Sequence, residues 1–103
     1  MAFEPGTIIA YAIVDSNAFT KQSGFASIDG TTTAGTYVLT LSSDNAIDDT
    51  EMVVSVAVRG AAAVNQVATF SSTSDTVKNV FIKTASTAAA VAGNFTVTIM
   101  RVP

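Results

Sequence analysis

The chain contains no cysteine and no histidine among its 103 residues. Without cysteine it has no disulfide, no thiolate nucleophile and no thiolate metal ligand. Without histidine it lacks an imidazole base, a serine–histidine pair and an imidazole ligand for a metal. Because most common catalytic constellations need one of these side chains, we expect that the protein is not an enzyme and uses no cofactor.

Charged residues are also scarce, at 13% of the chain, which is about half the usual share for a soluble domain. The net charge is −3, and the basic residues are scattered rather than clustered. The chain therefore lacks the basic patch that nucleic acids or anionic membranes require, and we expect neither as a partner. Scarce charge favours a surface that is buried in an assembly. The alternative is a neutral surface kept soluble by its serine and threonine hydroxyls.

Long hydrophobic runs are missing as well. The apolar run Thr7–Val14 has eight residues, far fewer than the ~20 that a membrane-spanning helix needs. It predicts a strand that is buried on both faces or paired at an interface. Residues 1–6 carry Glu4 and Pro5 instead of the positive start of a signal peptide, so we expect a short N-terminal arm.

Strands with strict alternation between two faces dominate the rest of the chain. In these segments one set of alternate side chains is apolar and is expected to face a core. The expected inward residues are Tyr37, Leu39 and Leu41, then Val80 and Ile82, and finally Phe95, Val97 and Ile99. The four clearest strands are Gly35–Leu41, Glu51–Gly60, Asn79–Thr84 and Asn94–Val102.

Weaker signals lie between these strands. Ala18–Ser23 reads as a second, weaker strand, and Phe25–Asp29 as a strand that stops at an Asp-Gly dipeptide typical of hairpin turns. A loop at Thr31–Gly35 would follow. Gly60–Phe70 is interpreted as a loop and then a strand, although its alanine run favours a helix by propensity.

These elements predict one all-β domain over residues 7–103, following the arm at residues 1–6. A chain of this length is expected to form one domain and to bury roughly two thirds of its unfolded surface. Seven or eight short antiparallel strands at regular spacing are typical of a β-sandwich or jelly-roll-like fold.

One acidic loop is a weak candidate for a metal site. Asp44, Asp48, Asp49 and Glu51 lie close together in sequence, and oxygen ligands of this kind can hold calcium. The spacing does not match the twelve-residue calcium loop and the segment lacks its glycine. A solvated connection that uses Asp and Asn for turn geometry is the favoured reading.

Most aromatic residues are expected to face inward, which leaves little for a stacking platform. The exceptions are Phe3, in the arm, and Phe81, which is out of phase with the inward residues of its strand. We therefore expect protein–protein contacts at the arm and at Phe81. The candidate interface residues are Met1, Ala2, Phe3, Glu4, Pro5 and Phe81.

From Ile8 onward the chain resembles small β-domains of tailed-phage structural proteins, which occur as capsid cement or decoration proteins and at the ends of tail fibres. The motifs that carry the resemblance are G-x-Y-x-L-x-L at Gly35–Leu41, M-V-V-x-V at Met52–Val56 and F-x-V-x-I at Phe95–Ile99. The resemblance implies a homotrimer. The turn at Thr84–Thr87 differs from the N-S-S-G-like turn that is usual in fibre tips.

A cement protein is favoured over a fibre tip because the sequence has no stalk, heptad repeat or collagen-like repeat. The expectation is a virion structural protein on the outer capsid surface, which binds the major capsid protein and stabilises the shell by many weak contacts. A receptor- or glycan-binding module of a tail fibre is the alternative, and another self-assembling surface subunit is a third.

Overall fold

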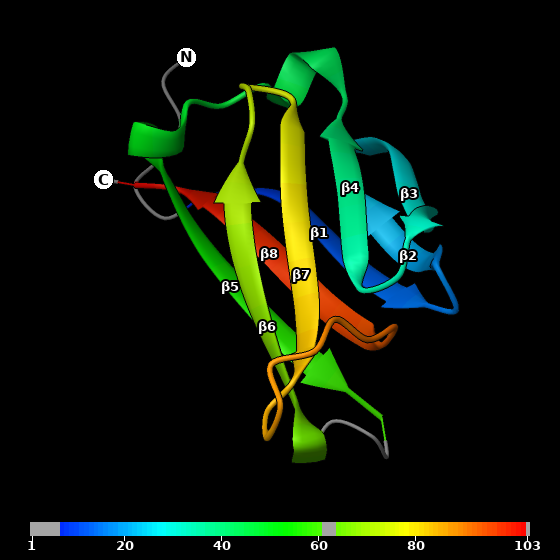
Figure 1. The fold of residues 1–103 in the computed structure, drawn as a ribbon. Helices are drawn as coiled ribbons and strands as arrows, with labels where there is room; N and C mark the ends of the chain where they lie inside the picture. The colour runs from blue at the N-terminus through cyan, green and yellow to red at the C-terminus, as the bar shows by residue number, and fades with distance from the viewer. Residues whose placement is uncertain (1–6, 61–63, 103) are drawn as a thin grey trace.

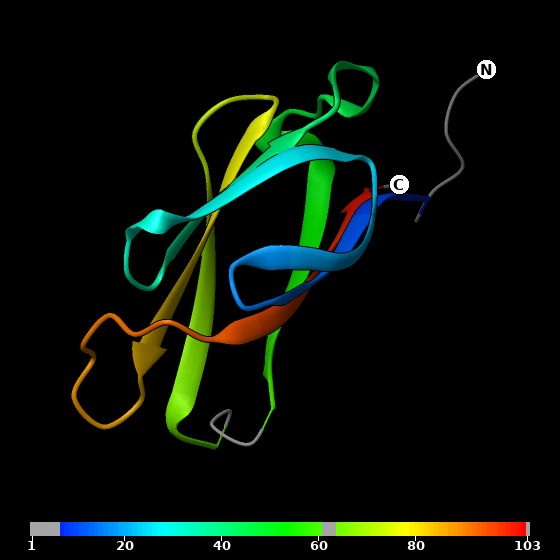
Figure 2. The same cartoon turned by 90° about the vertical axis from the view of Figure 1, so that its right-hand side faces the viewer.

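The computed structural model describes residues 7–60 and 64–102. Within these residues, eight strands form two antiparallel sheets that pack face to face (Figures 1 and 2). The all-β sandwich expected from the sequence is therefore confirmed. The first sheet has the order β2 (Ala18–Ser23), β1 (Ile8–Asp15), β8 (Asn94–Arg101), β5 (Met52–Arg59). The second sheet has the order β3 (Phe25–Thr33), β4 (Thr36–Leu41), β7 (Val77–Thr84), β6 (Gln66–Ser72).

The connectivity combines local hairpins with one long-range insertion. β1 pairs with β2, β3 with β4, and β6 with β7, each with its neighbour in sequence. β8 instead lies between β1 and β5 in the centre of the first sheet, as the red and blue ribbons of Figure 1 show. The chain crosses from β4 to β5 through two 3₁₀ turns, η1 (Ser43–Asn45) and η2 (Asp49–Glu51). No helix in the described residues is long and apolar enough to cross a membrane.

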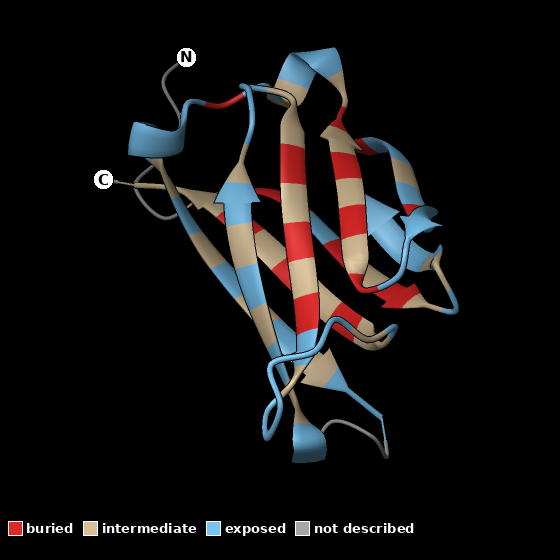
Figure 3. Ribbon diagram, viewed as in Figure 1, coloured by how far each residue is buried: buried red, intermediate tan, exposed pale blue. Residues whose placement is uncertain are grey.

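Alternation along the central strands builds the core between the sheets (Figure 3). The rings of Tyr37 and Phe95 meet edge to face with their centroids 4.9 Å apart, and both residues are fully buried. The inward residues expected for β4, β7 and β8 are all buried, so this prediction is confirmed. The buried hydrophobic residues are Ile9, Ala10, Ala12, Val14, Phe25, Tyr37, Leu39, Leu41, Ile47, Val80, Ile82, Phe95, Val97 and Ile99.

The prediction of a hairpin turn at Asp29-Gly30 is wrong. β3 runs through this dipeptide to Thr33, and the turn lies at Ala34 and Gly35. Gly30 is needed for space, because a Cβ atom there would stand 2.6 Å from the ring of Tyr37. The Asp29 carboxylate accepts hydrogen bonds from the backbone N–H groups of the next two threonines, where the register with β4 shifts. The close approach of the Tyr37 ring therefore requires a residue without a side chain at position 30.

The first strand is not buried on both faces, which corrects that alternative. Ile8 is 57% exposed and Tyr11 is 42% exposed, although their inward neighbours lie in the core. The alternative that this strand is paired at an interface stays a prediction. The weak strand at Ala18–Ser23 and a strand ending the Gly60–Phe70 segment are both present, as β2 and β6.

Candidate interaction surfaces

The structure does not bring the acidic loop together as a metal site. Asp48 accepts a hydrogen bond from the backbone N–H of Thr50 at 3.0 Å and caps η2. Glu51 pairs with Arg101, with 3.1 Å between Oε2 and Nη1. In residues 7–60 and 64–102 no three acidic side chains stand close enough to hold a metal ion together. Asp48 therefore serves turn geometry and Glu51 a surface ion pair.

A lysine ammonium lies beneath this loop. Lys78 follows the inward phase of β7 and is fully buried, although it is charged. Its Nζ donates three hydrogen bonds of 2.8 Å, to the carbonyls of Ile47 and Ser74 and to the Oγ of Ser72. These partners satisfy all three ammonium donors, which a buried cation requires. The ammonium thereby joins the 42–51 loop to the turn between β6 and β7.

Burial lowers the pKa of Lys78 below its ordinary value of 10.5, and the nearby carboxylates of Asp75, Asp49 and Asp48 partly oppose this shift. Sequence reasoning missed this residue because lysine is usually placed on a surface. The alternation of β7 did indicate burial, because Lys78, Val80 and Ile82 are alternate residues on the same face of this strand.

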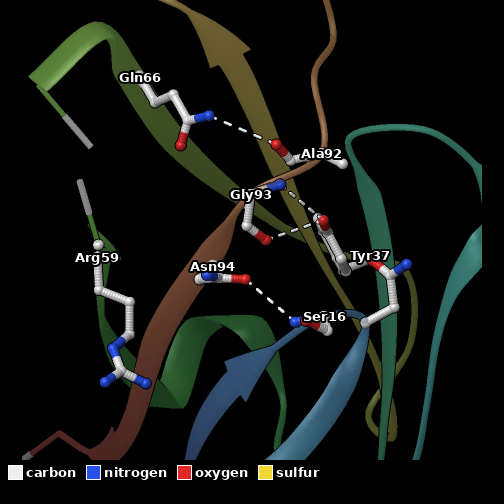
Figure 4. A pocket seen from close by; sticks show the side chains of 9 residues that line it. Ser16, Tyr37, Arg59, Gln66, Ala92, Gly93 and Asn94 are labelled. Atoms are coloured by element: carbon white, nitrogen blue, oxygen red, sulfur yellow. Dashed lines mark hydrogen bonds between the residues drawn. The ribbon is translucent and has the colours of Figure 1, made fainter. Parts of the chain in front are cut away.

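A polar hollow of about 270 Å³ opens at one end of the sandwich (Figure 4). It lies among the ends of β5, β6 and β8 and the β1–β2 turn. Tyr37 reaches its wall, where the hydroxyl donates to the carbonyl of Gly93 and accepts from the N–H of the same residue, both at 2.9 Å. The lining residues are Ser16, Asn17, Tyr37, Arg59, Gly60, Gln66, Ala92, Gly93 and Asn94.

The chemistry of this hollow suits binding of a small polar molecule. Its one charged lining residue, Arg59, pairs with Asp15 at 2.8 Å. Gln66 donates to the carbonyl of Ala92 at 3.4 Å, while its Oε1 is buried without a hydrogen-bond partner. Asn94 accepts from the N–H of Ser16 at 3.1 Å. The side chains offer amide donors and acceptors, and no carboxylate lines the hollow.

The outer face of the first sheet is broad and uncharged across the middle of three adjacent strands, β1, β8 and β5. The cross-strand register sets its residues in three rows across β1, β8 and β5. We call these nine residues the neutral face. Its rows are Ile8–Met100–Val53, Tyr11–Thr98–Ser55 and Ile13–Thr96–Ala57.

The neutral face holds three of the five large hydrophobic residues that the described part of the chain exposes. Val53 is 48% exposed, alongside Ile8 and Tyr11. Charged residues border the neutral face: Lys21 on β2 lies opposite Ile13, and the ion pairs Arg59–Asp15 and Arg101–Glu51 lie at the strand ends. Neutral apolar and hydroxyl side chains can be desolvated at low cost, so this face is suited to contact with another protein.

The candidate interface residues fall into two groups. Phe81 is partly buried and points to the outer face of the second sheet, between Thr36 and Thr69 on the neighbouring strands. This position leaves Phe81 a candidate for a protein contact. The other candidates, at residues 1–5, lie outside the residues that the structure describes.

Comparison with known proteins does not assign the chain to a family. No family model, no curated protein and no solved structure matches the chain.

Proposed function

We propose that the protein is a virion structural protein, a capsid decoration protein that forms a homotrimer on the outer capsid surface. The neutral face carries this proposal, because nine uncharged outward residues in register form a surface suited to protein contact. The resemblance to small phage β-domains supplies the partner, the major capsid protein. The scarce charge of the whole chain supports the same conclusion.

The expected mechanism is adhesion. Three copies would bury part of their neutral surface against one another and part against the shell. Each contact is small, but many copies bound to one shell act together, so their combined effect exceeds that of a single contact. Adhesion of this kind needs no reacting group.

A lysine at the centre of the neutral face tests the proposal. Thr98 lies on β8 between Tyr11 and Ser55, so the Thr98→Lys variant would bring a charge into the contact. Desolvating this charge is expected to weaken binding to expanded, DNA-free capsids of the encoding phage by at least about tenfold. Co-sedimentation with these capsids measures the binding, and light scattering after size exclusion measures the mass of the free protein.

Ser86→Lys is the matched control, because Ser86 is exposed in the loop after β7 and is neither on the neutral face nor paired with Phe81. We expect this variant to bind as the unchanged protein does. A mass three times that of the chain supports the trimer. Equal binding by the two lysine variants would contradict a role for the neutral face.

The polar hollow favours a second candidate, the receptor- or glycan-binding module. Its side-chain amides could exchange hydrogen bonds with sugar hydroxyl groups. A titration with a panel of monosaccharides, followed by the NMR signals of the Gln66 and Asn94 side-chain amides, measures this. Saturable shifts at millimolar sugar are expected if the hollow binds a sugar, and their absence would remove this candidate.

A further inference from the structure

Strand β5 forms one edge of the first sheet and lacks the usual protection of such edges. It pairs with β8 on one side, and no strand in the described residues pairs with its other side. Natural edge strands are blocked by lysine, proline, bulges or a covering element. β5 has the sequence MVVSVAVR, without proline, glycine or lysine, and its register with β8 is unbroken over eight residues.

The other edge of the same sheet differs. β2 carries Lys21 and its pairing with β1 contains a register shift between Ile13 and Val14. This edge is shorter, polar and irregular, which are the features that prevent pairing with another chain. The contrast within one sheet singles out β5.

The side of the sandwich formed by β5 and β6 is also its least covered side. The inward residues of β5 remain partly exposed, whereas those of β8 next to it are fully buried. Ala68 and Phe70 of β6 are partly exposed in the same way. The partly exposed inward residues of β5 are Met52, Val54, Val56 and Val58. A second protein chain bound along β5 would cover them.

A hydrogen bond at the start of β5 shows which of its main-chain groups point toward β8 and which point toward the free edge. The N–H of Val102 donates to the carbonyl of Glu51 at 2.9 Å, so Glu51 points its main chain toward β8. In an antiparallel ladder this direction alternates from residue to residue. The main-chain groups that point to the free edge are therefore those of Met52, Val54, Val56 and Val58.

We propose that β5 pairs antiparallel with β5 of a second copy about a two-fold axis through Ser55. This register sets Val54 opposite the partner copy's Val56 and Met52 opposite its Val58, so the free main-chain groups face each other. A two-fold contact is self-complementary, so each strand satisfies the other.

Charge favours this register over the one with Val56 on the axis. It places Glu51 opposite Arg59 of the second copy, on the outer face, once at each end of the paired strands. Glu51 already pairs with Arg101, and Arg59 with Asp15, so each end would join two ion pairs into one alternating network. A register shifted by one step of the ladder, with Val56 on the axis, would instead set Arg59 opposite Val53. Opposite charges across a strand pair favour the first arrangement.

The inference does not depend on the proposed function. The contact uses the edge of β5, whereas the proposed shell contact uses the neutral face around Thr98. Two-fold and three-fold contacts can also coexist on one shell.

Cysteine cross-linking tests the pairing, because the chain has no cysteine of its own. In the proposed register, Ser55 lies opposite itself in a non-hydrogen-bonded pair, where Cα atoms stand about 4.5 Å apart. This spacing suits a disulfide. We expect the Ser55→Cys variant to form a covalent dimer under mild oxidation, read on a non-reducing gel.

Ala57→Cys is the matched control, since it is equally outward and lies two residues away. In the proposed register the two Ala57 positions are separated by four residues along the strands, or about 13 Å. Ser55→Cys should therefore cross-link at least about tenfold faster than Ala57→Cys, because paired strands hold its thiols at a high effective concentration.

A double variant checks the register itself. Val53 of one copy lies opposite Ala57 of the other, so Val53→Cys with Ala57→Cys should cross-link where each single variant does not. Equal rates for Ser55→Cys and Ala57→Cys, or no cross-linking of Ser55→Cys, would overturn the proposal. Unchanged capsid binding by Thr98→Lys would contradict the proposed function but leave the β5 pairing standing, so the two proposals fail separately.

Discussion

Replacing Lys78 with alanine is expected to lower the free energy of unfolding by about 3 kcal/mol or more. The substitution removes three hydrogen bonds and leaves the buried carbonyl of Ile47 without the Lys78 ammonium, whereas the Ser74 carbonyl still accepts from the Ser72 hydroxyl. An unpaired buried acceptor costs about 1–3 kcal/mol, and loss of the buried methylenes adds a cavity. Urea denaturation followed by circular dichroism measures the change.

Lys78→Met separates the two causes. Methionine keeps most of the buried volume and removes the charge with its desolvation cost, but it also leaves the Ile47 carbonyl without its donor. We expect Lys78→Met to be less destabilising than Lys78→Ala by about 2 kcal/mol, the value of the restored packing. If alanine were tolerated as well as methionine, packing of the Lys78 stem would not contribute to stability, and if both variants were as stable as the unchanged protein, the ammonium would not be holding the loop.

The stability of the unchanged protein, compared with that of Lys78→Met, is also expected to depend on pH. Because burial lowers the pKa of Lys78 below 10.5, the folded chain binds this proton more weakly than the unfolded chain. Losing the proton therefore favours the folded state. The stability of the unchanged protein, relative to Lys78→Met, should rise as pH increases toward 10.5. A flat or falling difference over this alkaline range would contradict the direction of the shift.

Replacing Phe95 with alanine is expected to cost about 3–5 kcal/mol. Phe95 is fully buried on the central strand of the first sheet, and its ring contacts that of Tyr37 across the two sheets. The loss combines the transfer free energy of the ring, the cavity that remains and the aromatic contact. Thermal unfolding should show a large fall in Tm.

Phe95→Leu is the matched control, because leucine refills part of the cavity and is expected to cost less. Both variants leave the neutral face and the β5 edge unchanged, since Phe95 points into the core. A Phe95→Ala change below about 1 kcal/mol would mean that the two sheets are not held together at this ring pair.

The sequence predicted the parts of the fold that depend on alternation. In β4 and in the middle of β8 large apolar residues alternate mainly with threonine, so the inward set could be identified before the structure. The Asp29-Gly30 prediction failed for a different reason. That dipeptide has local turn chemistry, but the distant ring of Tyr37 takes the space where a Cβ would stand.

The candidate surfaces were harder to predict. Alternation shows which residues share an outward face, but the rows of the neutral face also need the strand order. β8 comes last in the sequence and yet joins Tyr11 to Ser55 through Thr98. The alternation of β7 gave Lys78 an inward position, but its three hydrogen-bond partners come from other segments of the chain and could not be identified from that pattern.

The central place of β8 also affects how the chain folds during synthesis. The other three strands of the first sheet are made before residues 94–101, and β5 has no hydrogen-bonded neighbour until β8 arrives. Contacts between segments far apart in sequence close slowly. During this interval the apolar strand Met52–Arg59 is open on both edges, a state prone to misassociation. Nascent chains shortened before Asn94 should therefore be those that most need a chaperone.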